Sequence, residues 1–171
     1  MDKEVFKAVI IPHKDKMFRF ARRILLDDDD AMDIVQEAFL RIWINKNKLE
    51  DVENKEAWCM RVTKNLALDK LKSGHTRHLS QMSEHHIAIA SGNADPSRTT
   101  EMKDTISSIT KILGTLPETQ RHVVHLRDIE GYSYKEIAEI LNVDMSNVKI
   151  CLFRARRAIR EKLYKIEHHG L

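Results

Sequence analysis

Apolar residues recur at helical rather than strand spacing along most of this chain. The region from Glu4 to Leu26 predicts one helix or a pair of helices, with a break near Pro12. Its predicted inward stripe is Val5, Val9, Phe18, Ala21 and Leu25. Nothing before residue 72 alternates between apolar and polar residues as a strand would. This half of the chain is therefore predicted to be helical.

Two further helices are predicted before residue 72. The run from Asp27 to Asp30 supplies an N-cap and favourable charge for a helix that ends near Asn45. Its inward residues are Ile34, Val35, Ala38, Phe39 and Ile42. A polar loop, Lys46–Asn54, leads to a helix from about Lys55 to Lys72, which Ser73 and Gly74 close. The inward residues of this helix are Trp58, Val62, Leu66 and Leu71.

The helical pattern is lost between residues 73 and 104, where small and polar residues predict a flexible linker. Periodicity returns at Ile106, and Thr115, Pro117 and Glu118 mark a new helix start. That helix is expected to end at Gly131. The predicted fold class is all-α, with two small helical domains at residues 1–72 and 105–171.

The C-terminal domain contains the signals of a helix-turn-helix. Ser133 and Glu136 have the spacing of a capping box, Asn142 tolerates a left-handed turn, and Val148 is a β-branched anchor for the second helix. Ala138 is small where the two helices would touch. The core side of the second helix is predicted to be Val148, Cys151 or Leu152, Ala155, Ile159 and Leu163. The opposite side is polar and basic, as a helix that enters a major groove would be.

Composition narrows the class of protein further. Only 5 Gly and 3 Pro in 171 residues argue against a turn-rich β fold, and the two cysteines, Cys59 and Cys151, are predicted to be free thiols. The net charge is +3, but it is unevenly spread, with six acidic residues at 27–37 and seven basic ones at 145–165. No signal peptide or transmembrane run is predicted, so a cytoplasmic protein without membrane insertion is expected.

Five segments together resemble bacterial sigma factors of the primary-sigma-like family, in the extracytoplasmic-function group. Two lie in the N-terminal half, DAMDIVQEAFLRIW at 30–43 and AWCMRVTKNLALDKL at 57–71. Three lie in the C-terminal half, LPETQR at 116–121, LRDIEGYSYKEIAEIL at 126–141 and VKICLFRARR at 148–157. The resemblance implies an alternative sigma factor that binds core RNA polymerase and promoter DNA. It also implies that an anti-sigma factor regulates the chain.

The resemblance also implies which residues do each task. The second helix would bind core polymerase through Asp33, Gln36, Glu37, Phe39, Leu40 and Arg41. The third helix would bind the minus-ten element through Arg61, Lys64, Asn65, Asp69, Lys70 and Lys72. The preceding loop, Lys46–Asn54, would capture a flipped base, and without an aromatic residue it would do so by hydrogen bonding. The minus-thirty-five element would be bound by Ser146, Asn147, Lys149, Ile150, Phe153, Arg154 and Arg157.

Other classes of protein fit the sequence less well. No phosphate-binding glycine loop, nucleophile elbow or paired carboxylates indicate an enzyme, and no cofactor is expected. The spacing of His75, His78, His85 and His86 fits no standard metal site. A regulator with the same helix-turn-helix would need an α/β or ligand-binding domain before residue 72. A pure interaction module that sequesters polymerase would leave the basic face at 145–165 unexplained.

Overall fold

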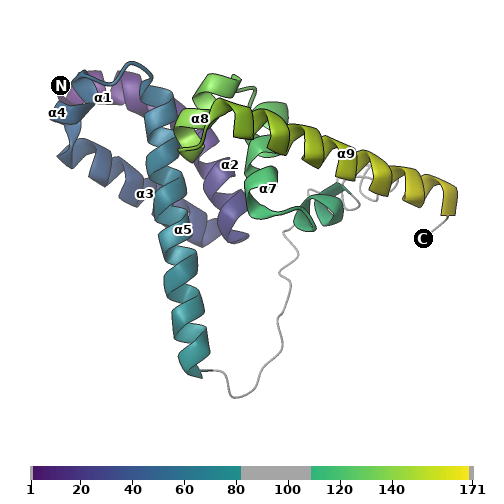
Figure 1. The fold of residues 1–171 in the computed structure, drawn as a ribbon. Helices are drawn as coiled ribbons and strands as arrows, with labels where there is room; N and C mark the ends of the chain where they lie inside the picture. The colour runs from purple at the N-terminus through teal and green to yellow at the C-terminus, as the bar shows by residue number, and fades with distance from the viewer. Residues whose placement is uncertain (1, 82–108, 170–171) are drawn as a thin grey trace, which may run out of the picture. The chain divides into compact units, whose positions relative to one another are not determined.

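A computed structural model gives the fold of residues 2–81 and 109–169, and the descriptions below concern these residues (Figure 1). The elements formed by them are all helical, and none of them is a strand, which confirms the all-α class. The α/β domain that the rival regulator would need is therefore not found within residues 2–72. The helices divide into an N-terminal unit with α1 to α5, and a C-terminal unit with α7, η2, α9 and most of α8.

The chain breaks near Pro12, as predicted. Helix α1 spans Lys3–Ile10, a 3-10 turn η1 spans Ile11–His13, and α2 spans Lys14–Leu25. The predicted inward stripe is only partly confirmed. Ala21 is buried and Val9, Phe18 and Leu25 are half-buried, but Val5 is 47% exposed whereas its neighbour Phe6 is buried. The buried stripe is Phe6, Ile10, Met17, Phe20, Ala21 and Ile24. Two adjacent apolar stripes run along this segment, and only the packing of α2 against α3 and α5 selects between them.

Helix α3, Asp28–Ile44, begins and ends where the sequence predicts. The Asp27 carboxylate accepts a hydrogen bond from the Asp30 backbone N–H at 2.8 Å, which confirms the N-cap. Four of the five predicted inward residues, Ile34, Val35, Ala38 and Ile42, are buried, and Phe39 is half-buried. The inward stripe of α3 is thus largely confirmed.

The polar loop predicted before the third helix contains a short helix of its own. Residues Lys46–Glu50 form α4, and Leu49 in its last turn is fully buried. One apolar side chain among polar neighbours gives no periodic signal, so the sequence could not reveal this element. The segment is fixed to the core of the N-terminal unit at Leu49 and is therefore not a free loop.

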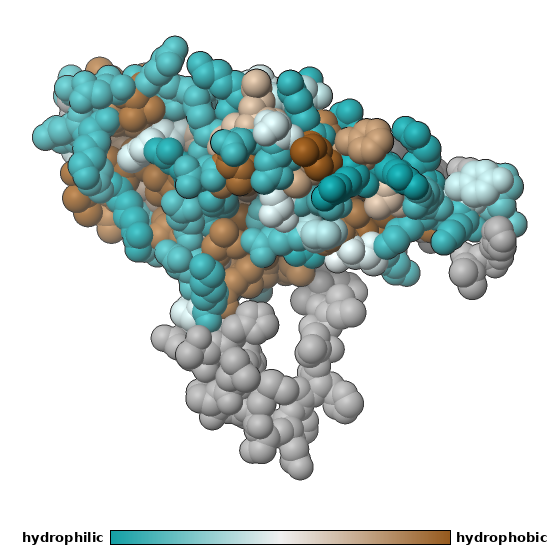
Figure 2. All heavy atoms as spheres, in the orientation of Figure 1, coloured by the Kyte–Doolittle hydropathy of each residue, from teal (hydrophilic) through white to brown (hydrophobic). Residues whose placement is uncertain are grey.

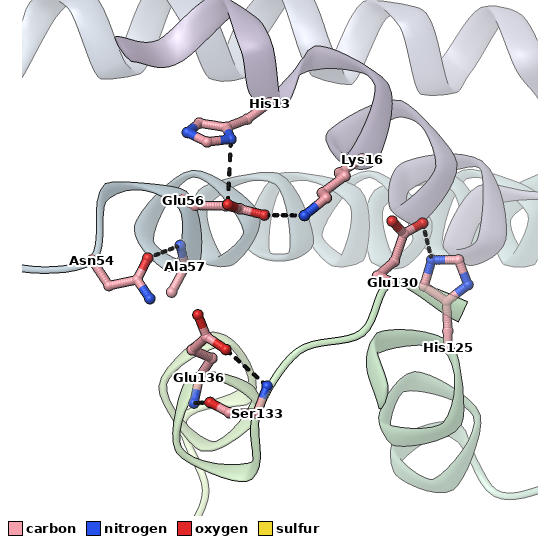
Figure 3. Close-up of polar contacts among 9 residues, drawn as sticks. All are labelled: His13, Lys16, Asn54, Glu56, Ala57, His125, Glu130, Ser133 and Glu136. Atoms are coloured by element: carbon pink, nitrogen blue, oxygen red, sulfur yellow. Dashed lines mark hydrogen bonds and ion pairs between the residues drawn. The ribbon is translucent and has the colours of Figure 1, made fainter. Parts of the chain in front are cut away.

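Helix α5, Lys55–Gln81, is longer than expected. It begins at the N-cap Asn54, whose side-chain oxygen accepts a hydrogen bond from the Ala57 N–H at 2.9 Å (Figure 3). The predicted closure at Ser73 and Gly74 is wrong, because the helix continues through both. A glycine costs a helix only about 1 kcal/mol relative to alanine, and the Ser73 hydroxyl bonds back to the Lys70 carbonyl at 2.9 Å within the helix. The remaining residues of the predicted linker, 82–104, lie outside the described residues.

The buried side of α5 also differs from the predicted one. Leu66 is buried as expected, but Trp58, Val62 and Leu71 are only half-buried. The core positions are Ala57, Cys59, Met60, Thr63, Leu66 and Ala67. Glu56 ties the first turn of α5 to the preceding elements, with its carboxylate 2.5 Å from Lys16 Nζ and 3.6 Å from His13 Nδ1 (Figure 3). The small residues among these core positions let α2 and α3 approach α5 closely. The prediction followed the large apolar residues of the helix and therefore did not identify the small ones.

The two thiols should differ sharply in reactivity. Burial, assisted by the charge of Glu56, raises the pKa of Cys59 from 9.0 to about 12, whereas Cys151 is partly exposed. At pH 8 a thiol reagent should therefore label Cys151 in the native protein and Cys59 only after unfolding. Because ionisation of Cys59 favours the unfolded chain, its contribution to stability is complete below pH 9.0 and is lost as the pH rises toward about 12. Mass spectrometry of the labelled protein checks the first result, and equal labelling of both thiols would contradict it.

The C-terminal unit begins, within the described residues, with a helical segment at 109–114 and continues with α7, Glu118–Val124, and the π-helical turn η2, His125–Ile129. The predicted helix start is confirmed, but Thr115 does not cap the helix. Pro117 is the N-cap, and the Thr115 hydroxyl donates a hydrogen bond backward to the Ile112 carbonyl at 2.7 Å. The helical stretch ends at Gly131 as predicted, with a φ of 81° that favours glycine.

Two helices complete this unit, α8 at Tyr134–Leu141 and α9 at Met145–His169. Helices α7 and α9 pack against each other. The buried side chains along them include Val123, Leu126, Val148, Leu152 and Ala155. On α9, Leu152 rather than Cys151 faces the core, while Ile159 and Leu163 are half-buried. The predicted core side of this helix is therefore confirmed.

Candidate nucleic-acid and partner surfaces

The turn between α8 and α9 has the local geometry that the sequence predicts for a helix-turn-helix. The Ser133 hydroxyl accepts from the Glu136 N–H at 3.2 Å, and the Glu136 carboxylate accepts from the Ser133 N–H at 2.8 Å (Figure 3). This reciprocal pair is a capping box. Asn142 ends α8 in the left-handed region at φ 56° and ψ 53°. Val148, fully buried, anchors the first turn of α9, so each of these predictions is confirmed.

The conformation of Asn142 allows a direct stability test. Asparagine and glycine adopt a left-handed backbone at little cost, whereas a β-branched residue pays roughly 1–2 kcal/mol there. We therefore expect Asn142→Gly to leave the thermal midpoint nearly unchanged and Asn142→Val to lower it by several degrees. Circular dichroism melts of the full chain measure both variants. Equal midpoints for the two would show that the turn relaxes around either residue.

All seven residues predicted to bind the minus-thirty-five element are exposed on α9. By helical periodicity they lie on the side of α9 opposite Val148, Leu152 and Ala155. Ile150 and Phe153 are 50% and 69% exposed. The structure thus brings the predicted set together on one accessible face, which comprises Ser146, Asn147, Lys149, Ile150, Phe153, Arg154 and Arg157 and is called the α9 face below.

Several side chains on and beside the α9 face have polar partners within the protein. Arg156 lies off it and pairs with the Asp128 carboxylate, which raises the pKa of the guanidinium. Arg157 lies on the face and pairs with Glu161, one turn along, at 2.8 Å. This pair is exposed, so a phosphate can compete for Arg157 at small cost. Cys151 contacts Asn147 Oδ1 at 3.2 Å, so the orientation of that amide is partly set by the thiol.

An aromatic contact that the sequence does not predict lies beside the α9 face. The Arg127 guanidinium lies 4.9 Å from the centre of the Tyr134 ring, and Lys149 Nζ lies 6.0 Å from it. Both distances are in the range of cation–π attraction. Arg127 also donates to the Tyr132 carbonyl at 2.7 Å. Tyr134 therefore draws two cations toward the start of α8, and a tyrosine in the first turn of a helix gives no sequence signal for such a cluster.

The six residues predicted to bind core polymerase lie on α3, and five of them are exposed. The five are Asp33, Gln36, Glu37, Leu40 and Arg41. Phe39 is half-buried and turns toward the side of the helix. Ile44, one turn after Leu40, was not predicted, yet it is 70% exposed while Leu40 is 58% exposed. Asp33, Glu37, Leu40 and Ile44 follow one stripe along the outer side of α3, called the α3 face below.

One ion pair and the contacts of the Trp43 ring describe the rest of the α3 surface. Arg41 Nη2 lies 2.6 Å from the Glu37 carboxylate within the helix. Trp43 is not part of the α3 face: its ring meets Phe6 edge-on at 5.2 Å, and Lys46 Nζ lies 4.1 Å from its centre. The half-buried ring therefore joins α3 to α1. The exposed apolar pair at Leu40 and Ile44, bordered by carboxylates, suits a partner that is both apolar and basic.

Five of the six residues predicted for the minus-ten element share one side of α5. They are Arg61, Lys64, Asn65, Asp69 and Lys72, at the spacing of one helix face. Lys70 lies on the opposite side, where its ammonium is 2.6 Å from Asp30 and 3.9 Å from Asp33 of α3. The structure thus separates Lys70 from the other five. Lys70 was predicted together with the other five because the sequence does not show which side of α5 faces α3.

The described residues contain neither a membrane-spanning helix nor a metal-binding cluster. None of the helices in those ranges has the length and apolar content that crossing a bilayer requires. Over the same ranges, no group of three or more His, Cys, Asp or Glu side chains is arranged to hold a metal ion. Of the four histidines considered in the sequence, His85 and His86 lie outside the described residues, and the side chains of His75 and His78 are not described either.

Comparisons with known proteins agree over both units. The family model described as Sigma-70 region 2 matches residues 9–77, and the one described as Sigma-70, region 4 matches residues 106–159. The chain is 30% identical over 175 residues to the ECF RNA polymerase sigma factor SigW of Bacillus subtilis, covering 95% of this chain and 90% of the relative. It is 26% identical to the ECF RNA polymerase sigma-E factor of Escherichia coli, covering 95% and 88%.

Solved structures show the same fold. The sigma factor RpoE of Bartonella quintana, in complex with the anti-sigma factor NepR, matches with a TM-score of 0.77 at 21% identity, over 94% of this chain and 98% of that one. CnrH, in complex with the cytosolic domain of CnrY, matches with a TM-score of 0.64, also at 21% identity, over 95% and 89%.

Proposed function

The chain belongs to the sigma-70 family of RNA polymerase sigma factors, in its extracytoplasmic-function group, and we propose how its residues divide the work of promoter recognition. As an alternative sigma factor it binds core RNA polymerase and directs initiation at its own promoters. We assign residues 1–72 to polymerase and minus-ten binding, 73–104 to a linker, and 105–171 to minus-thirty-five binding. The first nine residues of that linker, 73–81, continue helix α5.

The observation that carries this proposal is the two-sided character of α9. Its inner side, at Val148, Leu152 and Ala155, is buried in a packed unit, and its outer side presents exposed amide, cationic and apolar groups. A capped α8 and a left-handed turn hold this helix as the second helix of a helix-turn-helix, the helix that enters the major groove. Lys149 and Arg154 would reach base edges there, and Arg157 would bind phosphate.

The α3 face would bind core polymerase. Its apolar centre at Leu40 and Ile44 would be buried, and its carboxylates at Asp33 and Glu37 would meet basic groups of the partner. The side of α5 with Arg61, Lys64, Asn65, Asp69 and Lys72 would hold the backbone and an unstacked base of the minus-ten element. Lys70 would support this surface indirectly, through its ion pair with Asp30. We also propose that the exposed part of the 46–54 segment, after α4, takes up the flipped base.

We propose an anti-sigma factor as the regulator of this chain. One structural relative is named as a sigma factor in complex with an anti-sigma factor. A competitor of this kind would cover the surfaces that we assign to polymerase binding. We further propose that the protein acts in the cytoplasm, has no catalytic activity of its own and requires no cofactor. Recognition split between two small domains would make promoter binding strong only once both are held on polymerase.

Run-off transcription tests the proposal. The purified chain is added to sigma-free core polymerase and a promoter pool from the source genome, and the transcripts are sequenced. We expect new start sites that share a spaced, two-part upstream motif. Absence of new starts, with duplex binding by the free chain retained, would instead indicate a regulator that acts without replacing the sigma subunit.

A further inference from the structure

The centre of the α9 face is apolar, which its proposed phosphate and polar contacts do not explain. Ile150 is 50% exposed and Phe153 is 69% exposed. They lie one helical turn apart on the side of α9 farthest from the core. Figure 2 shows hydrophobic atoms over the N-terminal half of α9, set among hydrophilic ones. One exposed apolar residue needs no explanation, but two that occupy the middle of a polar and basic face do.

The groups that border this pair are polar or cationic. By helical periodicity, Lys149 lies on one flank of the pair and Arg154 on the other, while Ser146 and Arg157 continue the stripe at either end. Lys149 is also near the Tyr134 ring, at 6.0 Å. A partner that covers Ile150 and Phe153 must therefore bring negative charge to both flanks and an apolar group to the middle. The major groove of duplex DNA does this where it contains thymine, whose C5 methyl lies between two phosphate backbones.

We propose that Ile150 and Phe153 read thymine methyl groups at neighbouring base pairs of the upstream promoter element. This rests on the proposed function and adds its chemical specificity. Residues three apart on a helix are separated by about 4.5 Å along its axis, close to the spacing of about 3.4 Å between successive bases on one strand. Each side chain can therefore meet a different base pair. Apolar contact with the methyl distinguishes thymine from cytosine, which has no methyl at that position.

The test removes only the methyl group. Holoenzyme is assembled from the full chain and sigma-free core polymerase on a promoter found by run-off with ordinary DNA. Each thymine of the upstream element is replaced in turn by deoxyuridine, which keeps the base pair. We expect the substitution to weaken binding about fourfold at one or two adjacent positions. This is the change in affinity that corresponds to burial of one methylene-sized group, about 0.8 kcal/mol. Holoenzyme that carries Phe153→Ala or Ile150→Ala should bind the thymine and deoxyuridine templates equally well at the corresponding position.

Arg154→Ala is the matched control, since it should weaken binding to both templates and keep the fourfold ratio. Both tested side chains are exposed, so circular dichroism should show an unchanged fold. The inference is overturned if no thymine is methyl-sensitive, if the element contains no thymine, or if the ratio survives in both alanine variants. It is also overturned if a variant that carries both Ile150→Ala and Phe153→Ala binds both templates as tightly as the wild type, which would assign the pair to a protein partner. Absence of start sites on ordinary DNA would instead overturn the proposed function itself.

Discussion

Holoenzyme that carries Arg154→Ala should initiate at its own promoters roughly ten- to 100-fold less often than the wild type. Arg154 is exposed at the flank of the α9 face, two residues from the next guanidinium on the helix. A guanidinium that binds a base edge in two places contributes about 1–3 kcal/mol of discrimination. The fold should be unaffected, because no part of the core depends on this side chain. Run-off transcription from an identified promoter, at fixed salt, measures the loss.

The chain offers a control that removes the same charge from the same helix. Arg156→Ala deletes a guanidinium that pairs with Asp128 and lies off the α9 face. We expect promoter use within about twofold of the wild type and a loss of stability under about 1 kcal/mol, as for other partly exposed ion pairs. Equal loss of transcription in the two variants would mean that Arg154 contributes only net charge.

Replacing Leu40 by asparagine should weaken binding to core polymerase by roughly ten- to 100-fold. Leu40 is 58% exposed at the centre of the α3 face, so the free protein loses little from the change. Burying a leucine at an interface contributes about 1.5–3 kcal/mol, and an unpaired amide in its place adds a penalty. Competition against a labelled sigma factor for sigma-free core polymerase measures the affinity. Ile44→Asn should act in the same direction, since Ile44 extends the same stripe.

Leu26→Asn is the matched control for this substitution. Leu26 is 70% exposed and lies at the end of α2, outside the α3 face. Its backbone is left-handed, at φ 59°, a conformation that asparagine adopts more readily than leucine. The control should therefore bind polymerase normally and be at least as stable as the wild type. Normal polymerase binding by Leu40→Asn would remove the α3 face from the polymerase interface.

Local chemistry explains what could be predicted about the candidate surfaces. The capping box at Ser133 and Glu136, the turn at Asn142 and the anchor at Val148 each depend on residues within about ten positions. Such short-range rules hold without knowledge of the partner helices. The exposed side of α9 followed from the same signals, because a helix that buries one stripe must present the opposite one.

The errors arose where two local interpretations were equally good. Val5 and Phe6 each begin an apolar stripe, and only α3 and α5 decide that Phe6 is buried. Lys70 and Lys72 are both cations near the end of the predicted third helix, yet Lys70 is opposite the carboxylates of Asp30 and Asp33. Thr115 and Pro117 both suit a helix start, and the observed N-cap is Pro117. Neighbouring elements settle each case.

The sequence by itself determined the helical class, the helix-turn-helix and the segregation of acidic from basic surface, because capping, turns, periodicity and charge are properties of short segments. Tertiary structure decided which of two apolar stripes is core, that a small helix at Lys46–Glu50 is held by Leu49, that Ile44 joins the α3 face, and that Lys70 pairs with Asp30 on the other side of α5. These features depend on contacts between residues far apart in the chain, and burial and ion pairing exist only after the helices have packed.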